Sequence, residues 1–168
     1  VVDELIKKSY HIDKRSLLKL EADQELFGGF AYALNDFVIH KKDSTSMITV
    51  HTYLNGEFMN SYWADGLIVA TPTGSSAYSL SCGGPILIPK SGSFAITPIA
   101  PHNLSVRPVV IPDDTVLSFE IEGRVKSYLI SLDSRNSSIK KGTQIAVKKA
   151  DYTFNLIRLS NENYLDAL

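Results

Sequence analysis

A tight turn between two similar runs of residues constrains the fold of this chain more than any other feature of its sequence. Residues 47–54 and 58–63 are rich in β-branched and aromatic side chains, and they flank the dipeptide Asn55-Gly56. Asn and Gly both tolerate the positive φ angles of a type I′ turn, so the segment is predicted to be a β-hairpin. Residues 16–21 and 30–40 have the same strand character. Many short strands between turn signals favour an all-β sandwich or barrel over a parallel α/β sheet.

The same reasoning predicts two more hairpins and a small amount of helix. Residues 116–121 and 126–132 flank Glu122-Gly123, and residues 144–149 and 153–159 form a candidate third pair that Gly142 introduces. Residues 3–8 and 75–81 are predicted to be short helices. No internal repeat or linker interrupts the chain, so residues 1–168 are expected to form a single domain.

Composition narrows the class of protein. The chain has 168 residues and a formal net charge of −1, which argues against a nucleic-acid partner. A chain of this size buries roughly 70% of the surface that it exposes when unfolded, which is enough for a core without disulfides. The single cysteine, Cys82, and the lack of a basic and apolar N-terminal segment indicate the cytoplasm. No apolar run approaches the ~18 residues of a membrane span.

One long stretch of the chain is almost free of charge. Between Gly66 and Val106, 41 residues, the only charged side chain is Lys90, and the stretch holds seven serines and five of the seven prolines. Its large apolar residues indicate that it is folded and largely buried. Buried hydroxyl groups need hydrogen-bond partners, so the stretch is either a set of tightly packed turns or part of a ligand site.

The chemistry concentrates in residues 65–81. An apolar strand at residues 67–70 is expected to enter a turn at residues 71–74, and a helix is expected to begin at Ser75. Amides at a helix N-terminus favour anions, and Gly74 would let a phosphate approach the backbone closely. The segment lacks the glycine spacing of the dinucleotide fingerprint and the lysine of the ATP loop. It is therefore a candidate cradle for a pyrophosphate or a ribose, or an ordinary turn between a strand and a helix.

Several of these motifs together resemble a known enzyme family. They are residues 65–78, Gly83-Gly84-Pro85, residues 96–102, Arg107-Pro108, Pro112-Asp113 and Ser131-Leu132-Asp133. The chain from about Arg15 onward resembles the C-terminal domain of the ATP-dependent NAD kinases. The resemblance implies a mainly β fold, a two-layer antiparallel β-sandwich with one or two short helices that is the C-terminal domain of a two-domain kinase. It also implies the transfer of a phosphoryl group from ATP to the 2′-hydroxyl of the adenosine ribose of NAD, which gives NADP.

The resemblance assigns one group of residues to the adenosine half of the dinucleotide. Asn35-Asp36 stands where the family has an Asn-Glu pair, and Asp36 is expected to accept hydrogen bonds from ribose hydroxyls. Because aspartate is shorter than glutamate by one methylene, a shifted strand or a bridging water is expected there. Asp133 matches an acidic residue near the dinucleotide, and Ser134-Arg135 follows it where many relatives have Gly-Gln.

A second group is assigned to the nicotinamide riboside half. The resemblance implies contacts from Asp65, Thr73, Ala77 and Ser81, with Tyr78 lining the pocket. Ser76 adds a hydroxyl group to the loop that holds Thr73. Some of these contacts are completed by a neighbouring subunit in the family, so a dimer or tetramer is expected. An interface core is depleted in charge, which agrees with the uncharged stretch.

The catalytic machinery that the family uses is missing from this sequence. NAD kinases have an upstream α/β domain with a Gly-Gly-Asp-Gly motif, whose aspartate is the proposed base. No Gly-Gly-Asp occurs here, so we expect no catalytic residue in this chain and no turnover by the chain alone. Mg²⁺ is expected to arrive with the phosphates of ATP, so no protein metal site is predicted. Two alternatives remain, the equivalent domain of a diacylglycerol- or sphingosine-type lipid kinase and a non-enzymatic self-association module.

Overall fold

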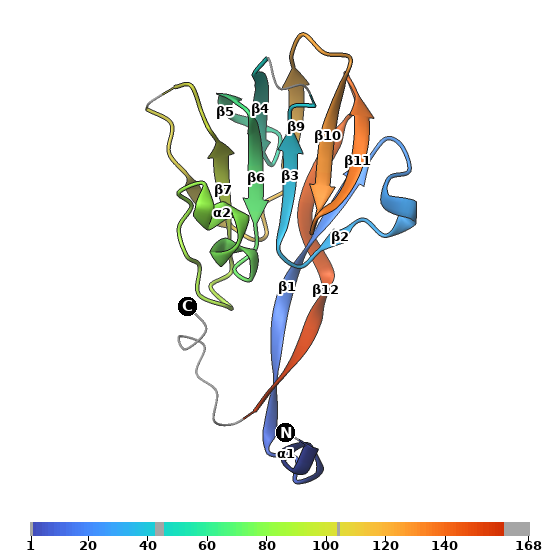
Figure 1. Cartoon of the computed structure of the whole chain (residues 1–168), viewed down its shortest axis with the longest axis vertical. Helices are drawn as coiled ribbons and strands as arrows, with labels where there is room; N and C mark the ends of the chain where they lie inside the picture. The colour runs from blue at the N-terminus through green and yellow to red at the C-terminus, as the bar shows by residue number, and fades with distance from the viewer. Residues whose placement is uncertain (1, 43–45, 104, 160–168) are drawn as a thin grey trace.

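The chain folds into two antiparallel sheets that pack face to face (Figure 1). A computed structural model describes residues 2–42, 46–103 and 105–159. The first sheet has the spatial order β2-β1-β12-β9-β4-β5. Its strands are β1 (Tyr10–Ala22), β2 (Tyr32–Ala33), β4 (Ile48–Leu54), β5 (Glu57–Ala64), β9 (Leu117–Glu122) and β12 (Ile145–Leu159).

The second sheet carries the segments that the sequence singled out. Its spatial order is β11-β10-β3-β6-β7-β8. Its strands are β3 (Asp36–His40), β6 (Gly66–Ala70), β7 (Ser93–Ile99), β8 (Val109–Pro112), β10 (Ser127–Leu132) and β11 (Arg135–Lys140). Short helical segments lie outside the sheets, namely α1 (Val2–Ile6), η1 (Phe27–Gly29), η2 (Gly74–Ser76) and α2 (Tyr78–Ser81).

The core lies between the two sheets. Alternate residues of β10 are buried, as are alternate residues at the start of β4, because successive side chains of a strand point to opposite faces of its sheet. Phe37 of the second sheet meets Phe119 of the first with 5.8 Å between their ring centroids. Tyr62 and Tyr128 are fully buried, one from each sheet. This arrangement confirms the predicted two-layer antiparallel sandwich.

The Asn55-Gly56 hairpin is confirmed. Strands β4 and β5 pair from Ile48 opposite Ala64 to Leu54 opposite Glu57. Asn55 has a φ of 51° and Gly56 a φ of 85°, as a type I′ turn requires.

The second predicted hairpin is wrong, although both of its strands exist. Strand β9 pairs with β4 and β12 in the first sheet, whereas β10 pairs with β3 and β11 in the second. Residues 123–126 thus cross between the sheets and form no tight turn. Gly123 is absent from the positive-φ residues, and a side chain there would lie 3.2 Å from the hydroxyl of Tyr128. Gly123 therefore serves close packing.

The third predicted hairpin is also wrong, because residues 145–159 form one long strand. Strand β12 stays paired with β1 from Ile145 opposite Ala22 to Leu159 opposite Tyr10, with a bulge between Ser16 and Leu18. Beyond the bulge the two strands leave the sandwich as a two-stranded ribbon with α1 at its tip (Figure 1). Partner β1 supplies the hydrogen bonds that keep β12 extended past the expected turn.

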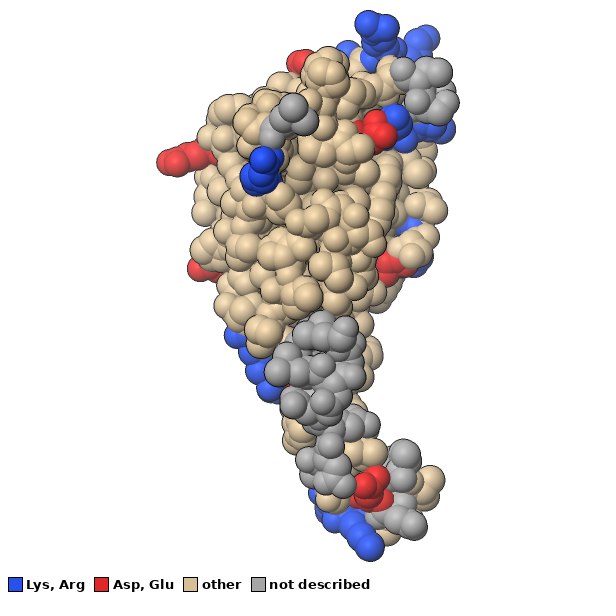
Figure 2. Space-filling model, turned by 60° about the vertical axis from the view of Figure 1, so that its left-hand side comes forward, with Lys and Arg blue, Asp and Glu red and all other residues tan. Residues whose placement is uncertain are grey.

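One face of the sandwich is nearly free of charge. Figure 2 brings forward the side on which α2 and β7 lie, and shows a broad area with few Lys, Arg, Asp or Glu side chains. Leu80, Ile86 and Ile88 of the uncharged stretch are exposed, as is Val110 of β8, the strand that pairs with β7. In the described part of the chain, no helix has the length and apolar character needed to cross a membrane.

Candidate functional site

Five of the nine predicted site residues meet in one hollow of the second sheet. The hollow has a volume of about 330 Å³ and lies where β3 begins and β10 ends, beside α2. Its lining residues are Asn35, Asp36, Val38, Ala77, Tyr78, Ser131, Asp133 and Ser134. The structure therefore brings together Asn35, Asp36, Ala77, Tyr78 and Asp133, which are far apart in the sequence.

The Asn35-Asp36 pair is held by its backbone. Asp36 is the first residue of β3 and pairs with Ala70 of β6, whereas Asn35 precedes the strand. The carboxylate of Asp133 accepts hydrogen bonds from the backbone N–H groups of Leu34, Asn35 and Asp36, at 2.6, 2.7 and 3.2 Å. Both of its oxygens accept these hydrogen bonds, so the carboxylate of Asp133 is already bound to the backbone.

The carboxyl group of Asp36 lies in an unusual environment. The residue is only 7% exposed. Burial, together with the negative charge of Asp133, raises the pKa of Asp36 from 3.8 to about 6. A buried carboxyl with a raised pKa that lines a hollow is a candidate functional group. When ionised it would accept hydrogen bonds from ligand hydroxyl groups strongly, because it has little water to compete with.

Tyr78 forms a wall that joins two regions of the site. Its ring stacks on that of His40, with 5.9 Å between the centroids, and its hydroxyl lies 3.4 Å from Nε2 of His40. Burial raises the pKa of Tyr78, and the nearby Cys82, Asp36 and Asp65 raise it further. The pKa of His40 is lowered, mainly by burial. A neutral imidazole beside a phenol makes this wall uncharged near pH 7.

Asp65 lies outside the hollow, at the other end of the same strand pair. Asp36 faces Ala70, whereas His40 faces Gly66, so Asp36 and Asp65 flank β3 and β6 at opposite ends. Oδ1 of Asp65 is 2.6 Å from Nζ of Lys41. A ligand that reached both carboxylates would have to run past Tyr78.

The loop before α2 is built from close backbone contacts, and the predicted helix at residues 75–81 is divided into η2 and α2. The hydroxyl of Thr73 accepts a 3.4 Å hydrogen bond from Arg15, whose guanidinium is held by Asp13 at 2.7 Å. Ser76 and Ser81 are exposed. Neither they nor Thr73 line the hollow with Asn35 and Asp36, so these three residues are placed beside it.

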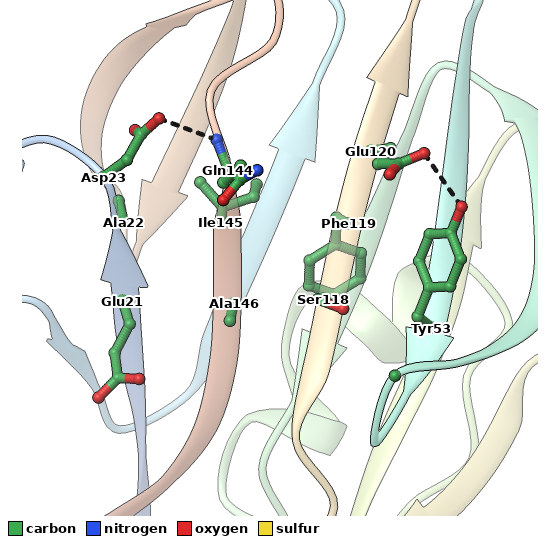
Figure 3. A pocket seen from close by; sticks show the side chains of 11 residues that line it. Glu21, Ala22, Asp23, Tyr53, Ser118, Phe119, Glu120, Gln144, Ile145 and Ala146 are labelled. Carbon is green, nitrogen blue, oxygen red and sulfur yellow. Dashed lines mark hydrogen bonds between the residues drawn. The ribbon is translucent and has the colours of Figure 1, made fainter.

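A larger hollow, about 580 Å³, lies on the first sheet, away from the residues predicted from the sequence. Figure 3 shows the phenol of Tyr53 pointing to Glu120, a hydrogen bond of 3.0 Å. The carboxylate of Glu21 is paired with Lys19 at 3.0 Å and Lys148 at 2.8 Å. Because these polar groups are satisfied by one another, we place the site in the smaller hollow.

The described residues contain no ready-made metal site. Among them, no group of three or more His, Cys, Asp or Glu side chains is arranged to hold a metal ion. The pair Asp36 and Asp133 comes closest to one in the hollow, and the oxygens of Asp133 already accept backbone N–H groups.

Comparison with known families decides what kind of domain this is. Residues 34–159 match the sequence model of the ATP-NAD kinase C-terminal domain. The chain belongs to this family. The match covers the hollow and its neighbouring loop, both sheets from β3 to β12, and the whole of the uncharged stretch.

Relatives and solved structures agree with the assignment. The chain is 56% identical over 99% of its length to the NAD kinase of Cytophaga hutchinsonii, and 51% identical over 98% to that of Flavobacterium johnsoniae. It spans 57% and 56% of the lengths of these two curated relatives. The lipid-kinase and self-association alternatives gain no support from relatives with these names.

The sandwich also matches solved structures of kinases with low sequence identity. A yeast NADH kinase complexed with NADH matches with a TM-score of 0.87 and 24% identity, over 98% of this chain and 51% of that chain. An NAD kinase from Archaeoglobus fulgidus in complex with ATP matches with a TM-score of 0.80 and 22% identity, over 94% and 59%. At these identities the likeness establishes the fold of this NAD kinase C-terminal domain.

Sequence reasoning missed residues that shape the hollow of this domain. Val38 lines it from the middle of β3, Ser131 from the end of β10, and Ser134 from the turn that follows β10. Thr71, which is fully buried, touches the backbone just before β3. The period of two could have indicated Val38, which lies two residues after Asp36 and so on the same face of the strand.

Proposed function

We propose that this chain is the dinucleotide-binding and self-association domain, residues 1–168, of an NAD kinase. The whole enzyme would transfer the terminal phosphoryl group of ATP to the 2′-hydroxyl of the adenosine ribose of NAD, giving NADP. The observation that supports this best is the hollow in which Asn35, Asp36, Ala77, Tyr78 and Asp133 meet. Most of these residues lie in the motifs through which the chain resembles the family.

In this proposal the hollow takes the adenosine half of the dinucleotide. Asn35 and Asp36 bind the adenosine, and the Asp36 carboxylate accepts hydrogen bonds from the ribose hydroxyls. The resemblance assigned Ala77 and Tyr78 to the nicotinamide riboside half, but both line the hollow with Asn35 and Asp36. We therefore propose that they also cover the bound nucleoside, since a tyrosine offers an apolar face and a polar tip. The hydroxyl that is phosphorylated is thereby held in one orientation, and orientation is a large part of phosphoryl-transfer catalysis.

The nicotinamide half is proposed to run along the wall formed by Tyr78. Asp65 lies at the far end of β3 and β6 and would meet the nicotinamide riboside there. Thr73, Ser76 and Ser81 belong to the segment that follows β6, on the other side of Tyr78, and would supply hydroxyl groups to the dinucleotide. The uncharged wall of Tyr78 and His40 suits a planar ring.

The chemical step needs groups beyond this chain. We propose an upstream domain that supplies the base and the donor site, and Mg²⁺ that neutralises the donor phosphates. Two matching structures contain NADH and ATP respectively, which supports a dinucleotide acceptor and an ATP donor. The cytoplasm is the proposed location, because the chain has a single cysteine.

The uncharged face is the proposed contact between subunits of a dimer or tetramer. It bears few charged side chains (Figure 2), and apolar residues such as Ile88 and Val110 are exposed on this part of the chain. Contiguous exposed apolar surface of this kind marks interaction sites. The near-neutral net charge of −1 supports neither a nucleic-acid nor a membrane-surface partner.

The decisive test is calorimetric titration of the full-length protein and of this chain with NAD, NADP, ATP and a soluble diacylglycerol. We expect saturable dinucleotide binding by both and NADP formation by the full-length protein only. Asp36→Ala should weaken NAD affinity by about 1.5–3 kcal/mol, which is the worth of hydrogen bonds to a charged group. Diacylglycerol binding without dinucleotide binding would reject the proposal.

A further inference from the structure

The two residues that carry the proposed adenosine site lie at a weak point of the fold. Strand β2 ends at Ala33 and β3 begins at Asp36. Leu34 and Asn35 therefore lie outside the hydrogen-bond ladders of both sheets. A backbone segment of this kind usually belongs to the mobile parts of a protein, and a binding site needs its groups fixed to within a fraction of an ångström.

The N–H groups of this segment are held from one side by Asp133. The residue lies about a hundred positions away in the sequence, in the turn between β10 and β11. Its Oδ2 accepts from Leu34 at 2.6 Å, and its Oδ1 accepts from Asn35 at 2.7 Å and from Asp36 at 3.2 Å. In return, the N–H of Asp133 donates to the carbonyl oxygen of Asp36 at 3.2 Å. Hydrogen bonds to a charged acceptor are about twice as strong as neutral ones.

The carbonyl groups of the same segment are held from the opposite side by Thr71. Its hydroxyl donates to the carbonyl oxygen of Leu34 at 2.6 Å, and its N–H donates to that of Asn35 at 2.9 Å. The same hydroxyl accepts from the N–H of Gly74 at 3.1 Å. Thr71 is fully buried, and its contact with Gly74 is buried, whereas its bond to Leu34 is partly buried.

Gly74 shows how closely the two segments approach. A side-chain carbon added there would lie 2.1 Å from the carbonyl oxygen of Asn35. Since that separation is far below van der Waals contact, only glycine allows the loop to lie against Asn35. The loop and the segment are thus in direct backbone contact.

We propose that Asp133 and Thr71 form a backbone clamp, in which they are positioning residues that fix Leu34 to Asp36 and so present the Asn35 and Asp36 side chains to the nucleoside. This inference rests on the proposed function for its ligand. It gives Asp133 a task other than the direct dinucleotide contact suggested by its place in the sequence. It also gives a task to Thr71, to which the resemblance assigned none.

The clamp links two walls of the hollow. Asp133 belongs to the β10–β11 side, and Thr71 leads into the loop that carries η2, Ala77 and Tyr78. Movement of either wall would shift the Asn35-Asp36 pair. The position of the ribose-binding carboxylate therefore depends on both walls at once.

The test uses the full-length protein with Asp133→Asn, Thr71→Val and the double variant. Asn keeps one acceptor oxygen and places an NH₂ group against a backbone N–H, and Val keeps the shape of Thr without its hydroxyl. The Kd for NAD should rise about tenfold for each single variant, the size of one lost charged or buried hydrogen bond. The double variant should lose less than the product of the two, because both act on one segment.

Two controls and a second readout separate positioning from general stability. Thr71→Ser keeps the hydroxyl and should bind NAD like the wild type, as should Asp114→Asn at an exposed site. Hydrogen exchange should be faster in the peptide that contains residues 34–36 of Asp133→Asn and Thr71→Val, and unchanged in core strands such as β6. The Thr71 pair keeps the test valid if Asp133→Asn does not fold.

The outcomes distinguish this inference from the proposed function. Unchanged exchange at residues 34–36 would overturn the clamp, and faster exchange with unchanged NAD affinity would overturn its role in binding. Absence of NAD binding by the wild type would reject the proposed function. The exchange measurement would still decide whether the clamp exists.

Discussion

The fold of the protein destabilises the ionised form of Asp36, which is the form that the proposed ligand needs. Its pKa is raised from 3.8 to about 6 by burial and by Asp133. Between those values the folded chain holds a proton that the unfolded chain has lost. Stability therefore falls as the pH rises through this window, and the loss is complete above about pH 6.

Asp36→Asn should consequently stabilise the fold and weaken the binding of NAD. Near pH 7.5 the variant removes the cost of a buried charge and should raise the free energy of unfolding by about 1–3 kcal/mol. Near pH 4, where the wild-type carboxyl is largely protonated, the gain should be small. Urea denaturation at both pH values checks this, with Asp114→Asn as the exposed control. Equal effects at the two pH values would contradict the assigned pKa shift.

Ligand binding should show the opposite pH dependence. Only the ionised carboxylate accepts hydrogen bonds at both oxygens, so the affinity of the wild type for NAD should fall as the pH drops below about 6. Asp36→Asn should bind weakly at every pH and show no such fall. Calorimetric titration with NAD between pH 5 and 8 measures the affinity of the wild type and of the variant on both sides of the pKa of Asp36. A variant that kept the acidic fall would assign it to another group.

The hairpin β10–β11 places Asp133 at the cost of strained backbone. Asp133 has a φ of 46° and Ser134 a φ of 67°, so both residues of this two-residue turn are in the left-handed region. Type I′ turns favour glycine at the second of these positions. Ser134→Gly should relieve strain and stabilise the protein by about 0.5–1 kcal/mol net of glycine's extra chain entropy.

The matched control for this turn is Ser134→Ala, which removes the same hydroxyl and keeps the strain. The midpoint of thermal unfolding should be higher than that of the wild type for Ser134→Gly and should not rise for Ser134→Ala. A gain in Ser134→Ala as large as in Ser134→Gly would indicate that loss of the hydroxyl, and not relief of strain, is responsible.

Among the strands and turns, the sequence correctly predicted the feature that depends only on local residues. The Asn55-Gly56 turn needs only its own φ angles, and it forms. Glu122-Gly123 carries a similar signal, yet the chain crosses there to the other sheet because β9 and β10 bury their side chains in one core from opposite sides. Strand β12 runs on through the expected break because β1 lies beside it. Pairing partners are set by packing across the molecule, which no local pattern encodes.

For the site too, the sequence predicted one part and left another part to the structure. The family motifs identified Asn35, Asp36, Ala77, Tyr78 and Asp133, and these meet in the hollow. How they are held could not be foreseen, because the contacts of Asp133 join residues about a hundred positions apart and the roles of Thr71 follow from backbone geometry. Resemblance supplies which residues belong to a site, whereas the fold determines what each one touches.

The whole molecule leaves two apolar regions exposed, and each suggests a different neighbour. Along the ribbon of β1 and β12, Ile12, Phe154, Leu156 and Ile157 are exposed. We propose that the upstream domain packs against this ribbon, because exposed apolar side chains that lie together mark interaction sites. The uncharged face beside α2 and β7 lies on the sandwich itself (Figure 2), which leaves it for a second copy of the protein.

A single charge on this face should therefore dissociate the proposed oligomer. Ile88 is 55% exposed and belongs to the uncharged stretch, so Ile88→Glu would place a carboxylate in an apolar contact. An uncompensated buried charge costs about 3–5 kcal/mol, so the dissociation constant should rise more than about a hundredfold. Light scattering behind a sizing column should show the mass fall to that of one protomer, and Val116→Glu, which adds the same charge at a site 39% exposed outside the stretch, should keep the oligomer. If Ile88→Glu kept its mass while Val116→Glu lost it, the interface would have to be placed elsewhere on the sandwich.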